Sequence, residues 1–392
     1  MGGFAWRLQR ARRQAKAVAT IRALGGGVGY YDEYTDADGA ESRPKKTSAP
    51  AGSPFLQKWL GEDFFREVYF ATISADKRPS PEERNEFWQA AGQFGKLRSF
   101  SMDGEGWFER AAFAKLQGSP TMREICLMTG ETSNEDLAII GTMPGIVSLS
   151  LTGPTIDDQG IANLDRISQL RHFQLQQAKI TDAGVAHFVN HPELQSLNLS
   201  WNPITDRCTL SLAKLEKLKW LDLGSTGVTD QGLANLSTLP ELRTLNLAAT
   251  KITDAGLMHL RQMRTLENLN VVMTGVHGPG FIHLRELPKL RYVNLLGCPI
   301  TDDDVKYLQH LSHVENLDLR SSKMTDAGFA NLTLPPKVKT ISLPSRTRIT
   351  DKTLEALSRF PQLKIVQAHR TDVTPEGIAA FQKALPGCRV AK

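Results

Sequence analysis

Cysteine is scarce in this sequence: its 392 residues contain four, at Cys126, Cys208, Cys298 and Cys388. They lie far apart, and no CxxC pair or Cys/His cluster is present, so there is no basis for a zinc site or a disulfide framework. We therefore expect reduced thiols, most of them buried. The histidines and acids form no nucleophile–base set, and glycine-rich residues 25–29 lack the lysine of a phosphate-binding loop. The sequence predicts no catalytic residue, no metal site and no cofactor.

Long apolar runs are also absent. No stretch approaches the roughly 20 apolar residues of a membrane span. Residues 1–6, Met-Gly-Gly-Phe-Ala-Trp, contain neither a signal-peptide core nor a myristoylation signal. We therefore expect a cytoplasmic protein. The alternative is a membrane-associated protein attached through its N-terminus, if a hydrophobic segment precedes Met1.

Positive charge is concentrated at one end of the chain. The net charge is +5, and residues 1–22 contain no acid but several cations: Arg7, Arg10, Arg12, Arg13, Lys16 and Arg22. Because the rest of the chain is close to neutral, we expect no nucleic-acid partner, which would need a concentrated basic face. Residues 4–24 are predicted to form an amphipathic helix whose apolar face holds Phe4, Leu8, Ala11, Ala15 and Val18. This helix is either a solvated lead-in or a segment that contacts a membrane surface.

The most regular feature is an apolar triplet of the form L-x-x-L-x-L, such as Leu218/Leu221/Leu223, which begins near residue 97 and continues almost to the C-terminus. Its third residue recurs every 24 residues, at positions 127, 151, 175, 199, 223, 247, 271, 295, 319 and 343. A fixed period of this length indicates a solenoid of stacked units, and the triplet makes each unit a leucine-rich repeat.

Each unit continues with a turn and a helix. The turn ends in Ile-Thr-Asp or a close variant, as at residues 180–182. Thr is a good N-cap, and Asp is favoured near the positive end of the helix dipole. The predicted fold is therefore an α/β leucine-rich-repeat solenoid (horseshoe), with a parallel β-sheet on the concave face and helices on the convex face. The same argument makes Asp302, Asp303 and Asp304 helix-capping residues instead of metal ligands.

Composition and periodicity divide the chain into four parts: a basic helix and lead-in at residues 1–35, a flexible linker at 36–54, an atypical capping unit at 55–96, and a repeat domain of about 12 units of 24 residues at 97–392. In the capping unit, Ser80, Pro81 and Glu83 predict a helix that starts with a capping box. A strand should precede this helix, in a register set either by Phe65/Val68/Phe70 or by Val68/Ala71/Ile73.

The repeats resemble leucine-rich-repeat proteins of the ribonuclease-inhibitor-like type, especially the Thr-Asp-x-Gly-Leu class of bacterial repeat proteins and F-box leucine-rich-repeat proteins. The resemblance covers about residues 97–385. It implies that the side chain or the backbone of the residue three after each triplet bonds the loop of the next unit. That position holds Asn202, Thr226, Thr250, Thr274, Cys298, Ser322 and Thr371. Residues 12–33 and 60–65 are similar to the lead-in of the bacterial members.

Two rows of the expected sheet face outward, towards a ligand. One is a polar ladder whose side chains we expect to bond along the sheet: Asn198, Asp222, Asn246, Asn270, Asn294 and Asp318. In the neighbouring row, Trp220 and Tyr292 are exposed aromatics of the kind that anchor protein interfaces. The predicted partner site consists of Trp220, Asp222, Asn268, Tyr292, Asn294 and Arg320.

The repeat breaks at three places. Residues 276–280 replace Thr-Asp-x-Gly with His-Gly-Pro-Gly, so that helix start should be uncapped. The unit after Leu343 has one extra residue, and residues 129–136 replace the usual turn of an early unit. We interpret these breaks either as decay of the repeat or as marks of a site.

The sequence therefore favours a non-catalytic scaffold that recognises a partner protein on its concave sheet. Two alternatives stay open. One is a substrate-recognition adaptor of a ubiquitin-ligase-like complex, as in the F-box proteins, and the other is an envelope-associated structural protein tethered through its N-terminus. The sequence does not predict an oligomeric state.

Overall fold

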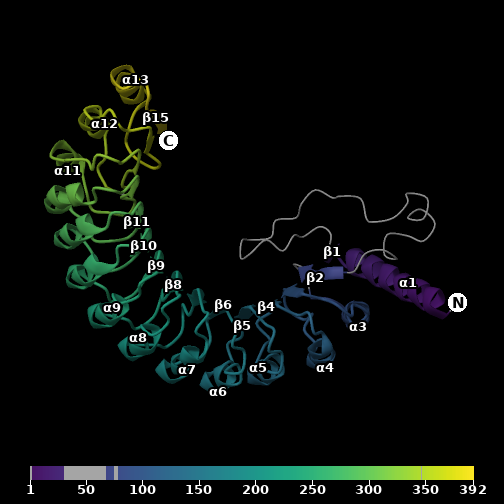
Figure 1. Cartoon of the computed structure of the whole chain (residues 1–392). Helices are drawn as coiled ribbons and strands as arrows, with labels where there is room; N and C mark the ends of the chain where they lie inside the picture. The colour runs from purple at the N-terminus through teal and green to yellow at the C-terminus, as the bar shows by residue number, and fades with distance from the viewer. Residues whose placement is uncertain (1, 31–67, 75–77, 346) are drawn as a thin grey trace. The chain divides into compact units, whose positions relative to one another are not determined.

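A computed structural model describes residues 2–30, 68–74, 78–345 and 347–392 (Figure 1). The expected linker at 36–54 and the lead-in similarity at 60–65 lie outside the described residues. So does residue 346, in the unit with the extra residue. The chain divides into two compact units, Met1–Lys179 and Ile180–Lys392, called unit 1 and unit 2 below.

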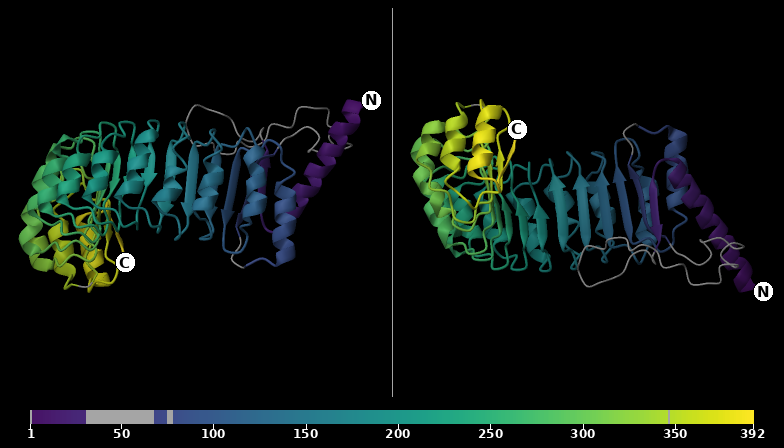
Figure 2. Two further views of the ribbon diagram at one scale, coloured as in Figure 1. Left: turned by 90° about the horizontal axis from the view of Figure 1, so that it is seen from below. Right: turned by 90° about the horizontal axis from the view of Figure 1, so that it is seen from above.

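In both units, helices cover one face of a sheet of short strands (Figure 2). In unit 1, strands β2 to β6 are parallel, and β1 pairs antiparallel with β2. The elements of unit 1 are α1 (Gly2–Ala23), β1 (Gly27–Tyr30), β2 (Val68–Ser74), α3 (Pro81–Ala91), β3 (Ser99–Asp103), α4 (Arg110–Phe113), η3 (Ala114–Gly118), β4 (Glu124–Met128), α5 (Asn134–Ile140), β5 (Ser148–Thr152), α6 (Asp158–Ala162) and β6 (His172–Gln176).

Helix α1 packs with its apolar side against unit 1, next to α3. Its buried residues are Ala11, Gln14, Ala17, Val18 and Ile21. The predicted apolar face was correct at Ala11 and Val18 and wrong at Ala15, which is exposed. The face is rotated because the apolar residues nearer the end of the helix, Ala17 and Ile21, meet the protein core.

The first strand and helix of the stack follow the sequence closely. Val68, Ala71 and Ile73 are buried, which decides the register of β2. The predicted capping box is confirmed: Ser80 Oγ accepts the N–H of Glu83 at 3.2 Å, and Glu83 accepts the N–H of Ser80 at 2.7 Å. In the core beside α3, aromatic rings take the place that leucines have in later repeats. Trp88 Nε1 donates to the carbonyl of Trp107 at 2.8 Å.

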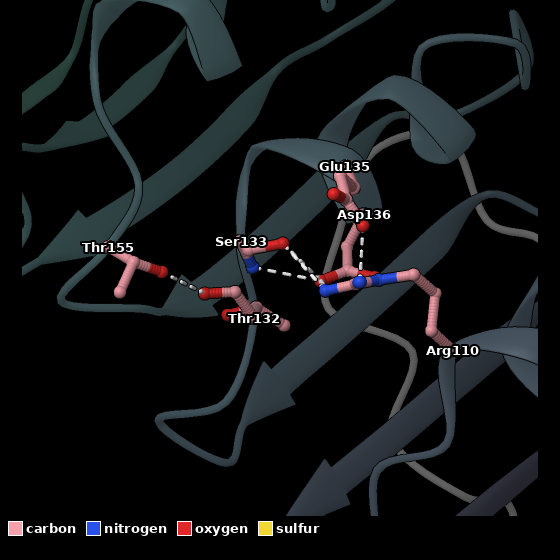
Figure 3. Close-up of polar contacts among 6 residues, drawn as sticks. All are labelled: Arg110, Thr132, Ser133, Glu135, Asp136 and Thr155. Carbon is pink, nitrogen blue, oxygen red and sulfur yellow. Dashed lines mark hydrogen bonds and ion pairs between the residues drawn. The ribbon is translucent and has the colours of Figure 1, made fainter.

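The irregular turn at residues 129–136 has a structural explanation (Figure 3). Asp136 is fully buried and accepts the N–H of Ser133 at 2.8 Å, which caps α5. Arg110, at the start of α4, donates to Asp136 at 2.7 Å and to Ser133 Oγ at 2.8 Å, and it also pairs with Glu135. This arginine therefore ties the starts of two neighbouring helices together.

Unit 2 is a stack of similar strand–turn–helix repeats, with parallel pairs from β7 to β15. All triplet residues from Leu194 to Leu343 are at most 1% exposed. The strands are β7 (Ser196–Asn198), β8 (Trp220–Asp222), β9 (Thr244–Asn246), β10 (Asn268–Asn270), β11 (Tyr292–Asn294), β12 (Asn316–Asp318), β13 (Thr340–Ser342), β14 (Ile365–Gln367) and β15 (Arg389–Ala391). The predicted α/β solenoid architecture is thus observed.

The helical segments of unit 2 mostly begin at the Asp of a Thr-Asp pair. Thr181, Thr205, Thr229 and other threonines N-cap these helices, as expected. The segments are α7 (Asp182–Ala186), η4 (His187–Asn190), α8 (Asp206–Leu212), α9 (Asp230–Leu236), α10 (Asp254–Leu257), η5 (Met258–Gln262), η6 (Pro279–Glu286), η7 (Asp302–His310), α11 (Asp326–Ala330), α12 (Asp351–Leu357) and α13 (Pro375–Ala384).

The aspartates of these pairs also link each helix to the next unit. The carboxylate of Asp206 accepts the backbone N–H of Thr229 at 2.7 Å and its hydroxyl at 2.6 Å. The same two bonds join Asp182 to Thr205, Asp230 to Thr253, Asp302 to Thr325, Asp326 to Thr350, and Asp351 to Thr374. We call these links the Asp–Thr staples. Each threonine hydroxyl thereby donates to the preceding unit while it accepts the cap bond of its own helix.

The staples explain the glycine of the Thr-Asp-x-Gly motif. A Cβ on Gly256 would lie 2.2 Å from Asp230 Oδ1, so the glycine leaves room for the carboxylate of the preceding unit. Thr353 stands at the equivalent position of a later unit. Its hydroxyl donates to Asp326 at 2.6 Å and makes use of the same contact.

Two residues after every triplet of unit 2 except the one that ends at Leu343, the backbone turns into the left-handed region. The residues there have φ between 53° and 63° (Trp201, Ser225, Ala249, Met273, Ser321 and Arg370), and Gly297 has φ 73°. L-residues disfavour this conformation by roughly 1–2 kcal/mol. The bend nevertheless keeps the bonds between units, since the N–H of Ser225 reaches the carbonyl of Ala248 at 2.7 Å.

The position three after each triplet follows the expectation only in part: Thr274 Oγ1 lies 3.7 Å from Cys298 Sγ of the next unit, whereas most of the other side chains bond within their own unit. Thr226 Oγ1 donates to the carbonyl of Leu223 in its own unit at 2.6 Å, and Thr250, Thr274 and Thr371 do the same. The longer Asn202 accepts the N–H of Ile180 in the preceding unit at 3.2 Å.

The four thiols are free, and three of them are buried, as expected; Cys126 is half-buried. Burial raises the pKa of Cys126, Cys208, Cys298 and Cys388. Protonated thiols in these surroundings are poor nucleophiles.

Candidate binding surface on the sheet of unit 2

The side chains of the polar ladder in unit 2 form hydrogen bonds with the backbone just after their own strands. At each step a side-chain oxygen accepts the N–H two residues later, as from Asn270 to Val272 at 3.1 Å and from Asn294 to Leu296 at 3.2 Å. Asn198, Asp222, Asn246 and Asp318 make the same bond. Asn and Asp are interchangeable here because each supplies the required acceptor. The expectation of bonds along the sheet holds between Asn246 and Asp222, which are 2.8 Å apart.

Asp222, a predicted site residue, is part of this support. It is 9% exposed, and its two oxygens accept from Gly224 N–H and Asn246 Nδ2, both at 2.8 Å. Burial raises the pKa of Asp222, and these two hydrogen bonds oppose the rise. With both oxygens occupied, this carboxylate positions the strand ends and offers little to a ligand.

The other predicted residues fall into two places. Tyr292 lies on β11, and its direct neighbour on β10 is Asn268, which donates to Thr244 Oγ1 at 3.1 Å. Asn294 lies two residues further along β11, so these three residues share one area of the sheet. Trp220 lies on β8, with β9 and β10 between it and Tyr292, and it is half-buried. Tyr292 is 36% exposed, so it presents its ring to solvent more than Trp220 does.

Arg320 follows β12 and is held in a fixed orientation. Its guanidinium bonds both oxygens of Asp318, with Nη2 to Oδ2 at 2.6 Å and Nε to Oδ1 at 3.0 Å. The Asp318 hydrogen bonds raise the pKa of Arg320, and Tyr292 adds a smaller contribution. Arg320 follows β12, the strand that pairs with the strand of Tyr292. A fixed, exposed guanidinium keeps donors for a carboxylate or carbonyl of a partner.

Sequence reasoning missed the apolar residues at the exit turns of the strands. Met273 is 70% exposed and Trp201 is 60% exposed, both at the left-handed position. Val272 and Leu296, on adjacent units, are half-buried beside Met273. Trp201 and Met273 both stand two residues after a triplet, so a comparison of that position across the units would have revealed them. The strand pattern, however, does not predict that a side chain at this position faces solvent.

We call Asn268, Met273, Tyr292, Asn294, Leu296 and Arg320 the Tyr292 surface. It extends over β10, β11 and β12 and their exit turns. Tyr, Met and Arg are the residue types enriched at protein interfaces. The surface combines large apolar side chains with a fixed cation on a sheet whose backbone groups are already bonded.

The break at residues 276–280 alters the staples of unit 2. His277 replaces the threonine: its N–H donates to Asp254 at 2.9 Å, and its ring nitrogens lie 3.1 Å from Asp254 and 3.3 Å from Asp304. Gly278 replaces the aspartate, so Thr301 bonds Asp304 of its own helix instead. The predicted capping role of Asp304 is confirmed, and η6 has no side-chain cap, as expected. A neutral imidazole can donate to only one of the two carboxylates.

Among the described residues of unit 1, the two larger open clefts both involve α3. One, of about 390 Å³, lies between α1 and α3 and includes Arg13, Lys16 and Glu86. The other, of about 340 Å³, lies between α3 and α4. Among the residues that the structure describes, no group of His, Cys, Asp and Glu is arranged to hold a metal ion. Within the same residues, no helix is long and apolar enough to cross a membrane.

A family model described as "Leucine Rich repeat" matches residues 190–207 and 239–260. Similar solved structures include an internalin from Listeria monocytogenes, with 16% identity, a TM-score of 0.49, and coverage of 86% of this chain and 93% of the other. A leucine-rich-repeat protein from Leptospira interrogans shares 15% identity at a TM-score of 0.47, with coverage of 81% and 93%. None of the curated proteins compared matches this chain. Structural similarity at this level carries no information about a ligand.

Proposed function

We propose that this chain, a leucine-rich-repeat protein, is a non-catalytic scaffold that binds a partner protein on the sheet of unit 2. The Tyr292 surface is the observation that carries the proposal. Leucine-rich-repeat proteins generally act through protein contacts, and this surface has the composition of an interface centre. Trp220, on β8, lies near its edge and extends the contact area.

The surface is suited to binding because it is rigid before a partner arrives. Asn294 holds the backbone of its strand end, and Asp318 fixes Arg320. Few side chains would therefore lose freedom on association, which lowers the entropic cost of binding. Met273 and Tyr292 supply exposed apolar area, and burial of such side chains gives most of the energy at interface centres.

Photo-cross-linking tests this proposal. A photoreactive amino acid at position 292 or 273 of the full chain should cross-link one discrete partner in cells of the source organism. The matched control is position 258, because Met258 is also an exposed methionine (48%) but lies on the helical side of the unit in η5. We expect no cross-link from position 258.

Affinity for the captured partner provides the quantitative check. The double variant Met273→Ala/Tyr292→Ala should lose about 2 kcal/mol or more of binding free energy, as expected for anchor residues. Met258→Ala should bind as wild type. Equal cross-linking from positions 258 and 292, or an unchanged affinity of the double variant, contradicts a binding site on the sheet.

The two alternatives from the sequence, an envelope-associated structural protein tethered through its N-terminus and a ubiquitin-ligase-type adaptor, both depend on the N-terminal region, as does the possible contact of residues 4–24 with a membrane surface. For contact with a membrane surface, the supporting feature is the exposed end of α1, where Trp6 is 59% exposed and Arg10 lies over its ring at 5.8 Å. Against it, Ala17, Val18 and Ile21 are buried within unit 1 and unavailable to lipid. For a ubiquitin-ligase-type adaptor, we find no supporting feature in residues 2–30, which are the described part of the region before residue 55.

A further inference from the structure

The residues that enter the strands of unit 2 form a charged rim. Backbone bonds place these entry residues in register, since Lys364 N–H bonds Lys339 O at 2.7 Å and Lys339 N–H bonds Glu315 O at 2.8 Å. The row consists of Lys219, Arg243, Glu267, Arg291, Glu315, Lys339 and Lys364. Neighbours in such a row are about 4.8 Å apart. The rim therefore presents a row of charged side chains along the N-terminal ends of the strands.

In the first half of the rim the charges compensate one another. Arg243 lies 3.6 Å from Glu267, and Lys219 lies 3.8 Å from Glu241. One strand earlier, Lys217 is paired with Glu193. A ligand could bind these cations only if it replaced an existing ion pair.

In the second half, from β11 to β15, cations are in excess. Glu315 is the acid of this stretch of the row, and Lys339 bonds it at 2.9 Å. The pKa of Glu315 is lowered chiefly by Lys339, with smaller contributions from Arg291 and Lys337. No ion pair with a carboxylate forms in the described residues at Lys289, Arg291, Lys337, Lys364 or Arg389, all of which are exposed, although Lys337 Nζ lies 3.1 Å from His313 Nδ1. We call these five residues the cationic strip.

Apolar side chains accompany the strip. Tyr292 follows Arg291 directly, and Ile365 follows Lys364; they are 36% and 37% exposed. Arg389 lies beside Ile365 in register on β15. Four strand steps separate β11 from β15, about 19 Å, so an extended segment of about six residues would cover the strip.

We infer that the cationic strip binds an acidic, extended protein segment in which apolar side chains alternate with carboxylates. This inference rests on the proposed binding function of the unit 2 sheet and specifies the chemistry of the partner. Carboxylates pair with Arg291, Lys364 and Arg389, while the intervening apolar side chains contact Tyr292 and Ile365. Charge complementarity of this kind directs the partner to one end of the unit and speeds association.

A protein segment fits this strip better than a nucleic acid does. Nucleic-acid binding requires a broad basic face that contacts many phosphates. On the opposite side, where the strands end, acids such as Asp302, Asp303 and Asp326 stand at the helix starts beside cations such as Arg320, so the basic residues form a narrow strip and not a broad basic face. A short acidic segment can remain on this strip.

Fluorescence anisotropy with the full chain tests the inference. The probe is a labelled peptide of about twelve residues, long enough to span the strip, in which glutamates alternate with leucines and tyrosines. The test variant is Arg291→Gln/Lys337→Gln/Lys364→Gln. The control, Lys214→Gln/Arg261→Gln/Lys383→Gln, changes the net charge equally at exposed cations that follow or lie within helical segments. All substituted residues are exposed, so both variants should fold, and circular dichroism verifies this.

We expect the peptide to bind wild type and the control variant alike, and the strip variant about tenfold more weakly. Glutamine in place of glutamate in the peptide should abolish binding, and salt should weaken it. Equal binding by the two variants overturns the inference. So does duplex DNA that binds more tightly than the peptide through the same residues. If no acidic peptide binds while position 292 still cross-links a partner, the chemistry assigned to the strip is wrong and the proposed function stands.

Discussion

The Asp–Thr staples predict that a single half-buried aspartate contributes strongly to the stability of unit 2. Asp326 is the best test, because it accepts three bonds: the N–H of Thr350 at 2.9 Å, its hydroxyl at 2.6 Å, and the hydroxyl of Thr353 at 2.6 Å. Asp326→Ala removes all three. Thr353 is fully buried, so its hydroxyl would lose its acceptor without access to water.

The magnitude follows from the exposure of each donor. A buried donor left unpaired costs about 1–3 kcal/mol, and a donor that regains water costs about 0.5–1 kcal/mol. The hydroxyl of Thr353 is the buried donor left unpaired, and the N–H and hydroxyl of half-buried Thr350 are the two donors that regain water. Together they give a cost of about 3 kcal/mol for Asp326→Ala. Asp326→Asn keeps one acceptor oxygen, so we expect it to lose about half as much.

The measurement is urea unfolding of the full chain followed by circular dichroism, with hydrogen exchange of β12 and β13 to locate the effect. Hydrogen exchange is needed because stacked repeats can depart from two-state unfolding. Asp303→Ala is the control: Asp303 lies in the first turn of η7, is exposed, and should cost less than about 1 kcal/mol through the helix dipole. If Asp326→Ala costs no more than Asp303→Ala, the staple is not a stabilising link and the motif acts through the dipole alone.

Two further predictions concern charged groups. Arg110→Ala should destabilise unit 1 by about 2 kcal/mol in urea unfolding, because it leaves buried Asp136 without its cation. Arg78→Ala, which removes an exposed pair, should leave the stability close to that of wild type. In acid, burial raises the pKa of Asp326, but bonds from Thr350 and Thr353 outweigh it, and the net pKa is lowered. Its stabilising effect is therefore present above about pH 4 and lost as pH falls through the lower folded value. Unfolding experiments should show a shallower loss of stability below that pH for Asp326→Asn than for wild type.

The sequence predicted the features of the fold that depend on residues close together in the chain. The apolar triplets, the threonine N-caps and the Ser80 capping box each involve residues within a few positions of one another, so periodicity and capping preferences identify them. The staples could not be found in this way. Asp206 and Thr229 come into contact only when two neighbouring repeats stack with their helix starts at the same level. In addition, helix capping already explained why each of these residues is present.

The positions of the candidate site residues, too, could be predicted from the sequence only where they depend on local pattern. Alternation along a strand correctly placed Tyr292 beside Asn268, but it could not show that Asp222 has no free oxygen. Met273 was missed because its exposure depends on a left-handed backbone, which glycine or asparagine would have signalled and methionine does not. The rotation of α1 depended on which side of the helix the rest of unit 1 covers, and its own sequence does not contain that information.

The replacement at Gly278 has a consequence for how unit 2 opens. Staples connect consecutive helix starts from Asp182 to His277 and again from Asp302 to Thr374, but between these two runs Thr301 is bonded within its own helix. At that step, the bond of the His277 ring to Asp304 replaces the usual pair of staple bonds. Cooperativity in a linear array depends on the weakest contact between neighbours. We therefore predict that unit 2 opens first at this step, where the staple bonds are missing although the strands remain paired, and the Tyr292 surface, with Met273 and Asn268 in one block and Arg320 in the other, spans the boundary between the two blocks. A partner bound there would couple the opening of one block to that of the other.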